Sequence, residues 1–166
     1  MMRWYAVHTK PKMERWARTN LWERGFEIYL PEYRKRRSHA RKVDYVAAPL
    51  FPRYLFVRAD LSASGVRAIN TAPGAVGVVS FGGRTAAAPD DVITELQSRE
   101  TEEGFVRFDP GDLRPGDRVR VLDGAFTDQL GICQKVSDNE RVVLLLSILG
   151  RDIRTSVPRT MLARAS

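Results

Sequence analysis

The densest group of chemically active side chains in this 166-residue chain is a basic run at residues 34–42. Seven of its nine positions are cationic or titratable, namely Arg34, Lys35, Arg36, Arg37, His39, Arg41 and Lys42. A charged run is usually a solvated face, but this density exceeds what solubility requires. Cations spaced in this way suit nucleic-acid phosphates, and binding that releases counterions is salt-sensitive. The run has no apolar side to bury, so we expect a loop or hairpin tip that contacts the nucleic-acid backbone without reading bases.

The distribution of charge supports the same interpretation. Residues 1–100 contain 17 Lys and Arg against 10 Asp and Glu, whereas residues 101–166 contain 10 of each. The whole net charge of +7 therefore belongs to the first part of the chain. This asymmetry indicates that one part works near polyanions and the other does not, although charge alone leaves open a basic domain without such a partner.

Catalytic constellations are not found in the sequence. His8 and His39 have no Cys or His at metal-ligand spacing, and neither a phosphate-binding loop nor a G-x-S-x-G elbow occurs. The pair Asp90-Asp91 is better explained by the start of a helix than by paired acid and base carboxylates. Cys133 is the single cysteine, so no internal disulfide can form. We expect a protein that is not an enzyme and has no cofactor or metal.

Strand and helix patterns alternate over the first hundred residues. Proline and glycine punctuate them, with Pro11 expected in the first turn of a helix and Gly25 at its end. The predicted strands are 3–9, 26–33, 43–48, 53–60 and 74–81, and the predicted helices are 12–24, 62–70 and 89–97. This alternation favours a compact α/β or α+β sandwich.

The second part of the chain has a different texture. Residues 101–113 have little periodicity and are interpreted as a linker, with Phe105, Val106 and Phe108 apolar enough to dock. Short strands with tight turns follow, including a strongly apolar strand at 142–148. Strands this short favour a small closed barrel, because closure removes exposed edges. The predicted domains are therefore 1–100 and 114–166, joined by 101–113.

The chain shows no targeting or membrane signal. No stretch approaches the roughly 18 uninterrupted apolar residues that a membrane helix needs. The apolar start is also shorter than the roughly 7–15 residues of a signal-peptide core. We therefore expect a cytoplasmic monomer.

Several motifs resemble the NusG/RfaH family of transcription factors. In the first half these are RWYAVHT at 3–9, PLFPRYLFV at 49–57 and TAPG at 71–74. In the second half PGDRV at 115–119, DGAF at 123–126, Gly131 and SILGR at 147–151 resemble a KOW domain. The resemblance spans nearly the whole chain in the family's domain order, and the spacing in the first half favours an RfaH-like paralogue. It implies an α+β fold, with an N-terminal antiparallel sheet flanked by helices and a small KOW-type SH3-like β-barrel.

The resemblance also implies a function. Family members promote transcription elongation or antitermination by gripping the β′ clamp helices of RNA polymerase with a hydrophobic patch. From the residues alone, Tyr54 and Phe56 share one strand face and could equally be core. The resemblance instead favours an exposed patch, which by position comprises Phe51, Tyr54, Phe56, Phe81, Ile93 and Leu96.

Four further cations and one amide side chain join the basic run as candidates for contact with upstream or non-template DNA. By resemblance and position these are Lys10, Arg15, Arg18, Arg67 and Asn70. Arg67 and Asn70 are also candidates for the polymerase β gate loop. The family's His-Thr-Thr segment corresponds here to Gly65-Val66-Arg67, and this departure argues against base-specific recruitment by the same element.

The resemblance assigns the C-terminal domain to a second partner, either a small-subunit ribosomal protein or Rho. The matching positions are Phe126, Ile148, Leu149 and Arg151. Leu149 is expected to be exposed, because it points opposite Ile148. RfaH refolds this domain into a helical hairpin, but the many β-branched residues here and the absence of an acid at Ala48 predict a stable barrel. The alternative function is a ribosome-associated or RNA-binding KOW protein without polymerase affinity.

Overall fold

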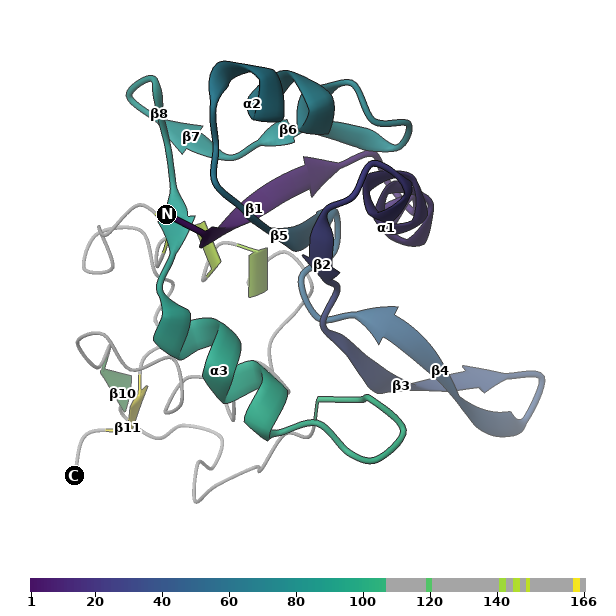
Figure 1. Ribbon diagram of the computed structural model, residues 1–166. Coiled ribbons are helices and arrows are strands. Elements are labelled where there is room, and N and C mark those ends of the chain that lie inside the picture. The colour runs from purple at the N-terminus through teal and green to yellow at the C-terminus, as the bar shows by residue number, and fades with distance from the viewer. Residues whose placement is uncertain (107–118, 121–140, 143–144, 147–148, 150–162, 165–166) are drawn as a thin grey trace.

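The computed structural model describes residues 1–106 and, beyond them, residues 119–120, 141–142, 145–146, 149 and 163–164. Residues 1–106 form an α+β domain with a central antiparallel sheet and three helices (Figure 1). This confirms the predicted fold class for the N-terminal part. No helix within the described residues is long and apolar enough to cross a membrane.

The central sheet has the strand order β2-β5-β1-β6, and β9 pairs with β1. Its strands are β1 (Arg3–Thr9), β2 (Glu27–Tyr29), β5 (Tyr54–Ala59), β6 (Ala75–Val78) and β9 (Ala87–Ala88). In the register of β1 with β5, Ala6 lies opposite Phe56 and Val7 opposite Leu55. Because strand side chains alternate between faces, the first pair points to one side of the sheet and the second pair to the other.

Two helices cover the face that carries Val7 and Leu55. Helix α1 (Glu14–Glu23) contributes Ala17 and Leu21, which lie one turn apart, and α2 (Ala63–Asn70) contributes Ile69. The side chains of Val7, Leu55, Ala17, Leu21 and Ile69 are all completely buried. This apolar layer fixes the direction in which the chain leaves β1 and enters α1.

Helix α1 begins two residues later than the sequence predicts. Lys12 has a φ of 61°, which is outside the helical region, so Pro11 lies in the preceding turn rather than in the first helical turn. The helix instead begins at Glu14, whose carboxylate accepts a hydrogen bond of 3.2 Å from the backbone N–H of Arg53. Arg53 itself has a φ of 73°. The carboxylate of Glu14 thus holds the left-handed turn that leads into β5.

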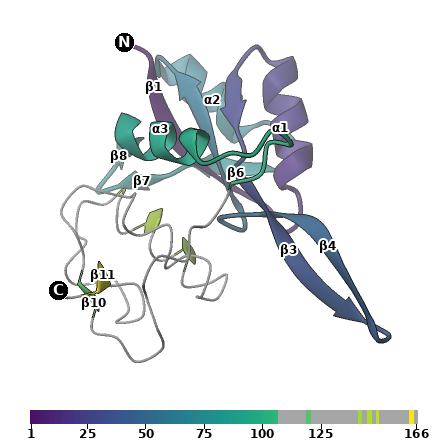
Figure 2. The same ribbon diagram turned by 90° about the horizontal axis from the view of Figure 1, so that it is seen from below.

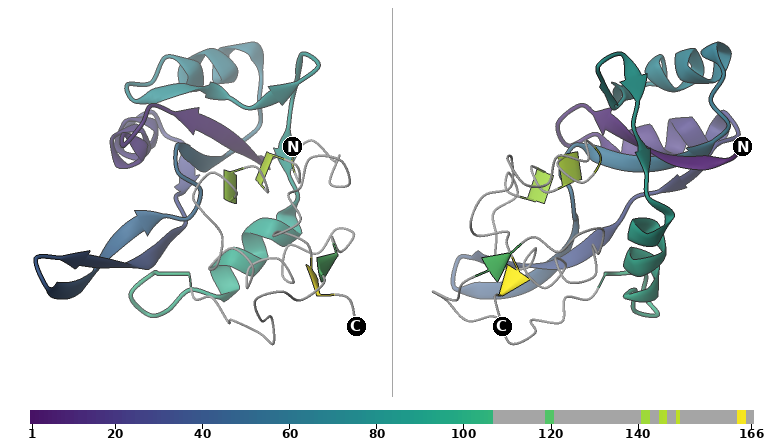
Figure 3. Two further views of the ribbon diagram at one scale, coloured as in Figure 1. Left: turned by 180° about the vertical axis from the view of Figure 1, so that it is seen from behind. Right: turned by 90° about the vertical axis from the view of Figure 1, so that its left-hand side faces the viewer.

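The opposite face of the sheet is covered by α3 (Asp90–Ser98) (Figure 3). Its buried residues Val92, Ile93 and Leu96 pack with Ala6 and Phe56 in one cluster. Asp90 and Asp91 lie in the first turn, where they favour the positive end of the helix dipole, as predicted. The segment after α3 also docks, because the backbone N–H of Val106 donates to the carbonyl of Glu32 at 2.8 Å.

A long two-stranded ribbon projects from the domain (Figure 2). It consists of β3 (Glu32–His39) and β4 (Lys42–Pro49), joined at Ala40 and Arg41, whose φ values are 49° and 65°. Two positive φ values are the geometry of a two-residue type I′ turn. Of the two predictions for 34–42, a loop is wrong and a hairpin tip is right at Ala40 and Arg41, with the hairpin strands reaching further into the run than expected because β4 supplies their hydrogen-bond partners. A shorter hairpin, β7 (Ser80–Phe81) with β8 (Arg84–Thr85), turns at Gly82 and Gly83.

The described C-terminal residues depart from the predicted strand at 142–148. Arg141, Val142, Leu145, Leu146 and Leu149 have helical backbone hydrogen bonding. The strand prediction is thus wrong at Val142, Leu145 and Leu146. The spacing from Arg141 to Leu145 to Leu149 aligns these side chains along one side of a helix, and packing against the N-terminal domain outweighs the local β propensity. In addition, β10 (Val119–Arg120) pairs antiparallel with β11 (Ala163–Arg164); the other predicted barrel strands lie outside the described residues.

Candidate functional site

Most of the predicted polymerase-binding residues gather in one group, which we call the aromatic cluster. It is built around Phe51, Phe56, Ile93 and Leu96, each at most 1% exposed. The rings of Phe51 and Phe56 meet edge to face, with centroids 6.3 Å apart and planes at 86°. Tyr54 lies half-buried at its border. The structure thus brings together five of the six side chains that the resemblance predicts for polymerase binding.

Three C-terminal side chains complete this cluster, and we call them the cover. They are Arg141, Leu145 and Leu149, exposed by 3%, 0% and 5%. Leu145 and Leu149 belong to the same cluster as Phe51 and Phe56. The cover therefore occupies the surface on which the sequence predicts an exposed patch.

Arg141 is held on the N-terminal domain by hydrogen bonds to the backbone and to a tyrosine. Its Nε donates to the carbonyl oxygen of Leu50 at 2.7 Å, and a terminal nitrogen donates to the hydroxyl of Tyr33 at 3.1 Å. Its guanidinium carbon also lies 5.0 Å from the centroid of the Tyr33 ring. A carbonyl, a hydroxyl and an aromatic face of the N-terminal domain thus support the buried cation.

Two expectations about exposure are therefore wrong in this structure. Phe51, Phe56, Ile93 and Leu96 are not open to solvent, because apolar side chains gain free energy when a further apolar layer covers them. Leu149 is likewise buried against that cluster rather than exposed. The sequence analysis missed Arg141 and Leu145 altogether, although the four-residue spacing that ends at Leu149 could have indicated a helical face.

Phe81 is separated from the other predicted patch residues. It lies on β7, is 44% exposed and is outside the aromatic cluster. Its hairpin partner is the short strand β8, so no sheet contact draws the ring toward α3. The structure therefore does not bring Phe81 into the site formed by the other five residues.

A histidine flanks Tyr54 at the border of the cluster. The rings of His8 and Tyr54 stack with centroids 5.0 Å apart and planes at 19°, because the two residues lie opposite each other in β1 and β5. Burial, reinforced by the positive charge of Arg53, lowers the pKa of His8 below its ordinary value. The border of the cluster therefore favours neutral imidazole over imidazolium.

The predicted basic residues of 34–42 all lie on the projecting ribbon and are exposed. One of them is neutralised, since Arg37 forms two hydrogen bonds with Asp44 at 2.6 and 3.0 Å. The hydrogen bond from Arg37 holds the pKa of Asp44 below its ordinary value. Arg34 instead lies over the ring of Tyr45, with its guanidinium carbon 5.3 Å from the centroid.

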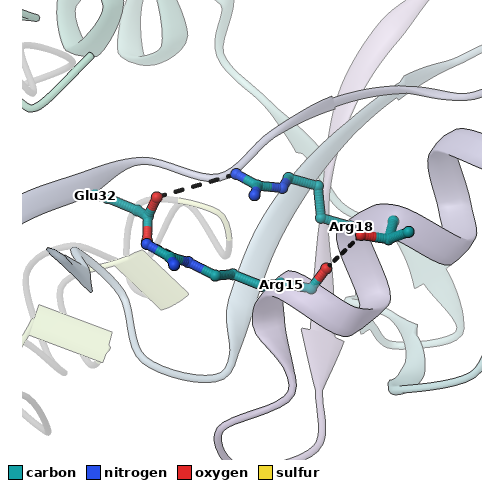
Figure 4. Close-up of polar contacts among 4 residues, drawn as sticks. Arg15, Arg18 and Glu32 are labelled. Carbon is teal, nitrogen blue, oxygen red and sulfur yellow. Dashed lines mark hydrogen bonds and ion pairs between the residues drawn. The ribbon is translucent and has the colours of Figure 1, made fainter. Parts of the chain in front are cut away.

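The two predicted arginines of α1 point toward one carboxylate (Figure 4). Arg15 donates to Glu32 from two nitrogens at 2.9 and 3.1 Å, and Arg18 approaches the other oxygen of Glu32 at 4.0 Å. Glu32 stands at the start of β3, so the pair joins α1 to the base of the ribbon. Part of the positive charge predicted for nucleic acid is thus used within the fold.

The remaining predicted nucleic-acid residues are dispersed. Lys10 is exposed after β1, and Arg67 is exposed on α2, which lies on the far side of the sheet from the ribbon (Figure 1). Asn70 has a structural role, because its Oδ1 accepts the backbone N–H of Val78 at 3.0 Å. Phe126, Ile148 and Arg151, predicted for the C-terminal partner, lie outside the described residues. Within the described part of the chain, no three His, Cys, Asp or Glu side chains are grouped to hold a metal ion.

Comparisons with known proteins place the chain among transcription factors. The sequence profile of the family described as "Transcription termination factor nusG" matches residues 2–101. The protein named "Transcription termination/antitermination protein NusG" from Thermus thermophilus is 30% identical over 98% of both chains. A protein of the same name from Staphylococcus carnosus is 25% identical over 93% of this chain and 91% of its own. A solved structure titled "Domain interaction in Thermotoga maritima NusG" matches at 20% identity with a TM-score of 0.49, covering 77% of this chain and 76% of that one.

Proposed function

We propose a mechanism for this chain on the premise that it belongs to the NusG family, whose profile covers its N-terminal domain and whose Thermus thermophilus member aligns with nearly its whole length. The family consists of non-enzymatic transcription factors, and the chain is accordingly a transcription termination/antitermination factor. What remains to be derived is how the described surfaces would perform this function.

The aromatic cluster is the proposed docking surface for RNA polymerase, with the β′ clamp helices as its ligand. The single observation that carries this proposal is the form of the cover. Its side chains come from helical residues spaced four apart, so the surface between Phe51, Leu96 and Tyr33 accommodates a helix. Helix-in-groove recognition uses anchors at this same spacing. A surface that accepts Leu145 and Leu149 can accept apolar side chains from a polymerase helix.

Cover and polymerase would then compete for one surface. While Arg141, Leu145 and Leu149 occupy the cluster, a clamp helix cannot contact it. If only a fraction of the molecules has an uncovered cluster, the apparent affinity for polymerase is reduced to that fraction of its intrinsic value. Each buried leucine stabilises the covered state by about 1.5–3 kcal/mol, so removing one shifts this equilibrium by tenfold or more. Release of the cover is therefore the proposed control step.

Other surfaces would act once the domain is docked. The ribbon would contact the backbone of upstream or non-template DNA, and Arg67 would face the β gate loop. By contacting the β′ clamp helices and the β gate loop together, the domain would bind the elongation-competent state of the polymerase more tightly than its other states and would so stabilise it. The C-terminal domain, with Phe126, Ile148, Leu149 and Arg151, would contact a small-subunit ribosomal protein or Rho at the effective concentration set by its tether.

The test measures retention of core RNA polymerase by the full-length chain. Leu145→Ala, which weakens the cover, should bind polymerase at least tenfold more tightly than the wild type. Adding Tyr54→Ala to that variant should remove most of the gain, because Tyr54 borders the exposed cluster. Phe81→Ala is the matched aromatic control, since Phe81 is exposed and outside the cluster.

Two results would contradict the proposal. If Phe81→Ala and Tyr54→Ala weaken polymerase retention equally, the cluster is not the docking surface. If none of the variants retains polymerase but all bind RNA, the chain is an RNA-binding KOW protein, which was the alternative from the sequence. Far-UV circular dichroism of each variant checks that the fold is preserved.

A further inference from the structure

The ribbon of β3 and β4 has two unlike faces. Residues directly opposite in an antiparallel pair point to the same side, and side chains alternate along each strand. Arg36 lies opposite Tyr45, Arg34 opposite Ala47 and Ser38 opposite Val43. We call the side that carries these residues the Tyr45 face. It comprises Arg34, Arg36, Ser38, Val43, Tyr45 and Ala47, and every one of them is exposed.

The opposite side of the ribbon is tied to the rest of the molecule. Tyr33, Val46 and Ala48 are half-buried there, and Tyr33 receives the hydrogen bond from Arg141. On this side Arg37 is paired with Asp44. Apart from the contacts of Glu32 with α1 at the base of the ribbon, these contacts lie on one side, and the Tyr45 face is left for a partner.

The Tyr45 face combines aromatic, apolar and cationic groups that do not serve the core. Tyr45 is 56% exposed and Val43 49% exposed, and both lie outside the apolar clusters of the domain. The guanidinium of Arg34 lies over the Tyr45 ring at 5.3 Å. Among the residues that the structure describes, no carboxylate forms an ion pair with Arg34 or Arg36. The face therefore offers a ring for stacking and two cations for an anionic ligand.

We propose that the Tyr45 face is a stacking platform for unpaired bases of a single-stranded nucleic acid. Tyr45 stacks on a base with the ring face that Arg34 does not cover. Arg36 binds a neighbouring phosphate. Proteins that bind single strands combine these elements, a positive track for the backbone with an aromatic ring for the bases. The proposal deepens the proposed nucleic-acid contact of the ribbon, on which it rests, by naming the form of the ligand.

Single strands fit this face better than duplexes do. A two-stranded ribbon matches the major groove in size, but the bases of a duplex present their edges there and keep their ring faces stacked on one another. The exposed ring of Tyr45 would then have no partner. In a single strand both the phosphates and the base faces are available, so the cations and the aromatic ring are used together.

The test measures fluorescence anisotropy of the full-length chain with three labelled oligonucleotides: a single-stranded oligo-dT, the corresponding oligo-U and a duplex of equal length. Tyr45→Ala should weaken binding of the single strands about tenfold or more and binding of the duplex less than about twofold. Tyr45→Phe should restore binding, because the phenyl ring retains the stacking face. Comparison of oligo-dT with oligo-U shows whether the ligand is DNA, RNA or either.

Two matched variants separate stacking from general effects. Trp22→Ala removes an aromatic ring that is 70% exposed on α1 and should leave affinity unchanged. Arg36→Gln should lower the salt dependence of single-strand binding by about 0.7 in the log–log slope, whereas Tyr45→Ala should not alter that slope. Thermal unfolding of Tyr45→Ala should match the wild type, since the ring is exposed.

The proposal is overturned if Tyr45→Ala weakens single-strand and duplex binding equally, if it has no effect, or if the wild type binds only duplex. Polymerase retention by Tyr45→Ala is measured in parallel and should remain at the wild-type level. Unchanged single-strand binding in Tyr45→Ala counts against the stacking platform alone. Failure of the Leu145→Ala and Tyr54→Ala variants to change polymerase retention counts against the docking surface alone.

Discussion

The aromatic cluster and the Tyr45 face show two ways in which one chain presents aromatic rings. In the cluster, Phe51 and Phe56 are completely buried and are sealed by the cover. On the ribbon, Tyr45 stands in solvent with a guanidinium over its ring. A guanidinium over an exposed ring gives that ring a favourable contact in solvent, whereas a large apolar surface gains free energy when it is covered. The first surface must therefore be uncovered before it binds, and the second is available at all times.

The largest expected difference between the two regions is in stability. Phe56→Ala should lower the free energy of unfolding by about 3–5 kcal/mol, because it deletes a completely buried ring. Tyr45→Ala should change it by less than about 0.5 kcal/mol. Urea denaturation of the full-length chain measures both values. Similar losses in the two variants would mean that the ribbon ring is as important to the fold as the cluster.

The second expected effect concerns the cover. Leu145→Ala should destabilise the covered state by about 2–5 kcal/mol, since Leu145 is completely buried in the cluster. Amide hydrogen exchange of the segment containing residues 141–149 should then accelerate by at least tenfold. Leu146→Ala, at a half-buried neighbouring position, is the control and should accelerate exchange much less. If amide hydrogen exchange accelerated equally in both variants, burial of Leu145 in the cluster would not be what holds the cover in place.

The third effect sharpens the contrast between free and paired cations. Arg36→Gln should reduce the salt dependence of single-strand binding by about 0.7 in slope, as one phosphate contact would. Arg15→Gln should change the slope much less, because Arg15 is hydrogen-bonded to Glu32. Titration of binding against salt concentration measures both slopes. A larger change for Arg15→Gln would place the nucleic acid along α1 rather than along the ribbon.

The smallest expected effect is on the pKa of His8, which tests whether the border of the cluster disfavours a positive charge beside an aromatic ring. The pKa of His8, stacked on Tyr54, should lie below its ordinary value of 6.5. Because the unfolded chain then binds the proton more readily, stability attributable to His8 is present above pH 6.5 and is lost as the pH falls toward the folded-state pKa. NMR titration of the His8 ring measures the shift, and Arg53→Gln should reverse part of it. A pKa above 6.5 would show that the cluster border tolerates a cation as readily as the Tyr45 face does.

Local pattern predicted much of the N-terminal domain. Strand β1 has the predicted bounds, and β5 and α3 begin and end within one residue of prediction. These elements have strong periodicity and clear punctuation, so local and tertiary preferences agree. Lys12 lies in a left-handed turn instead of the predicted helix, and the neighbouring Lys10 is fixed by a hydrogen bond from its backbone N–H to the carbonyl of Gly74, which is distant in sequence.

Long-range contacts account for the other misses. The basic run predicts a loop or a hairpin tip, and pairing with β4 decides for the hairpin and makes most of the run a strand. Leu145 was expected in a strand, yet its helical backbone and burial follow from contact with residues about 50 to 90 positions earlier. Phe81 was grouped with Phe56 by resemblance, whereas the short β7–β8 hairpin keeps it apart.

The amino-acid sequence by itself determined the class of fold, the family, the basic character of the N-terminal domain and the identity of most cluster side chains, because composition, periodicity and motifs are local properties. Only the tertiary structure decided which rings are covered, which cations are paired and which face of the ribbon is open. Those properties depend on the free energy of contacts between residues far apart in the chain, where burial of an apolar surface outweighs the conformational preference of the segment that covers it.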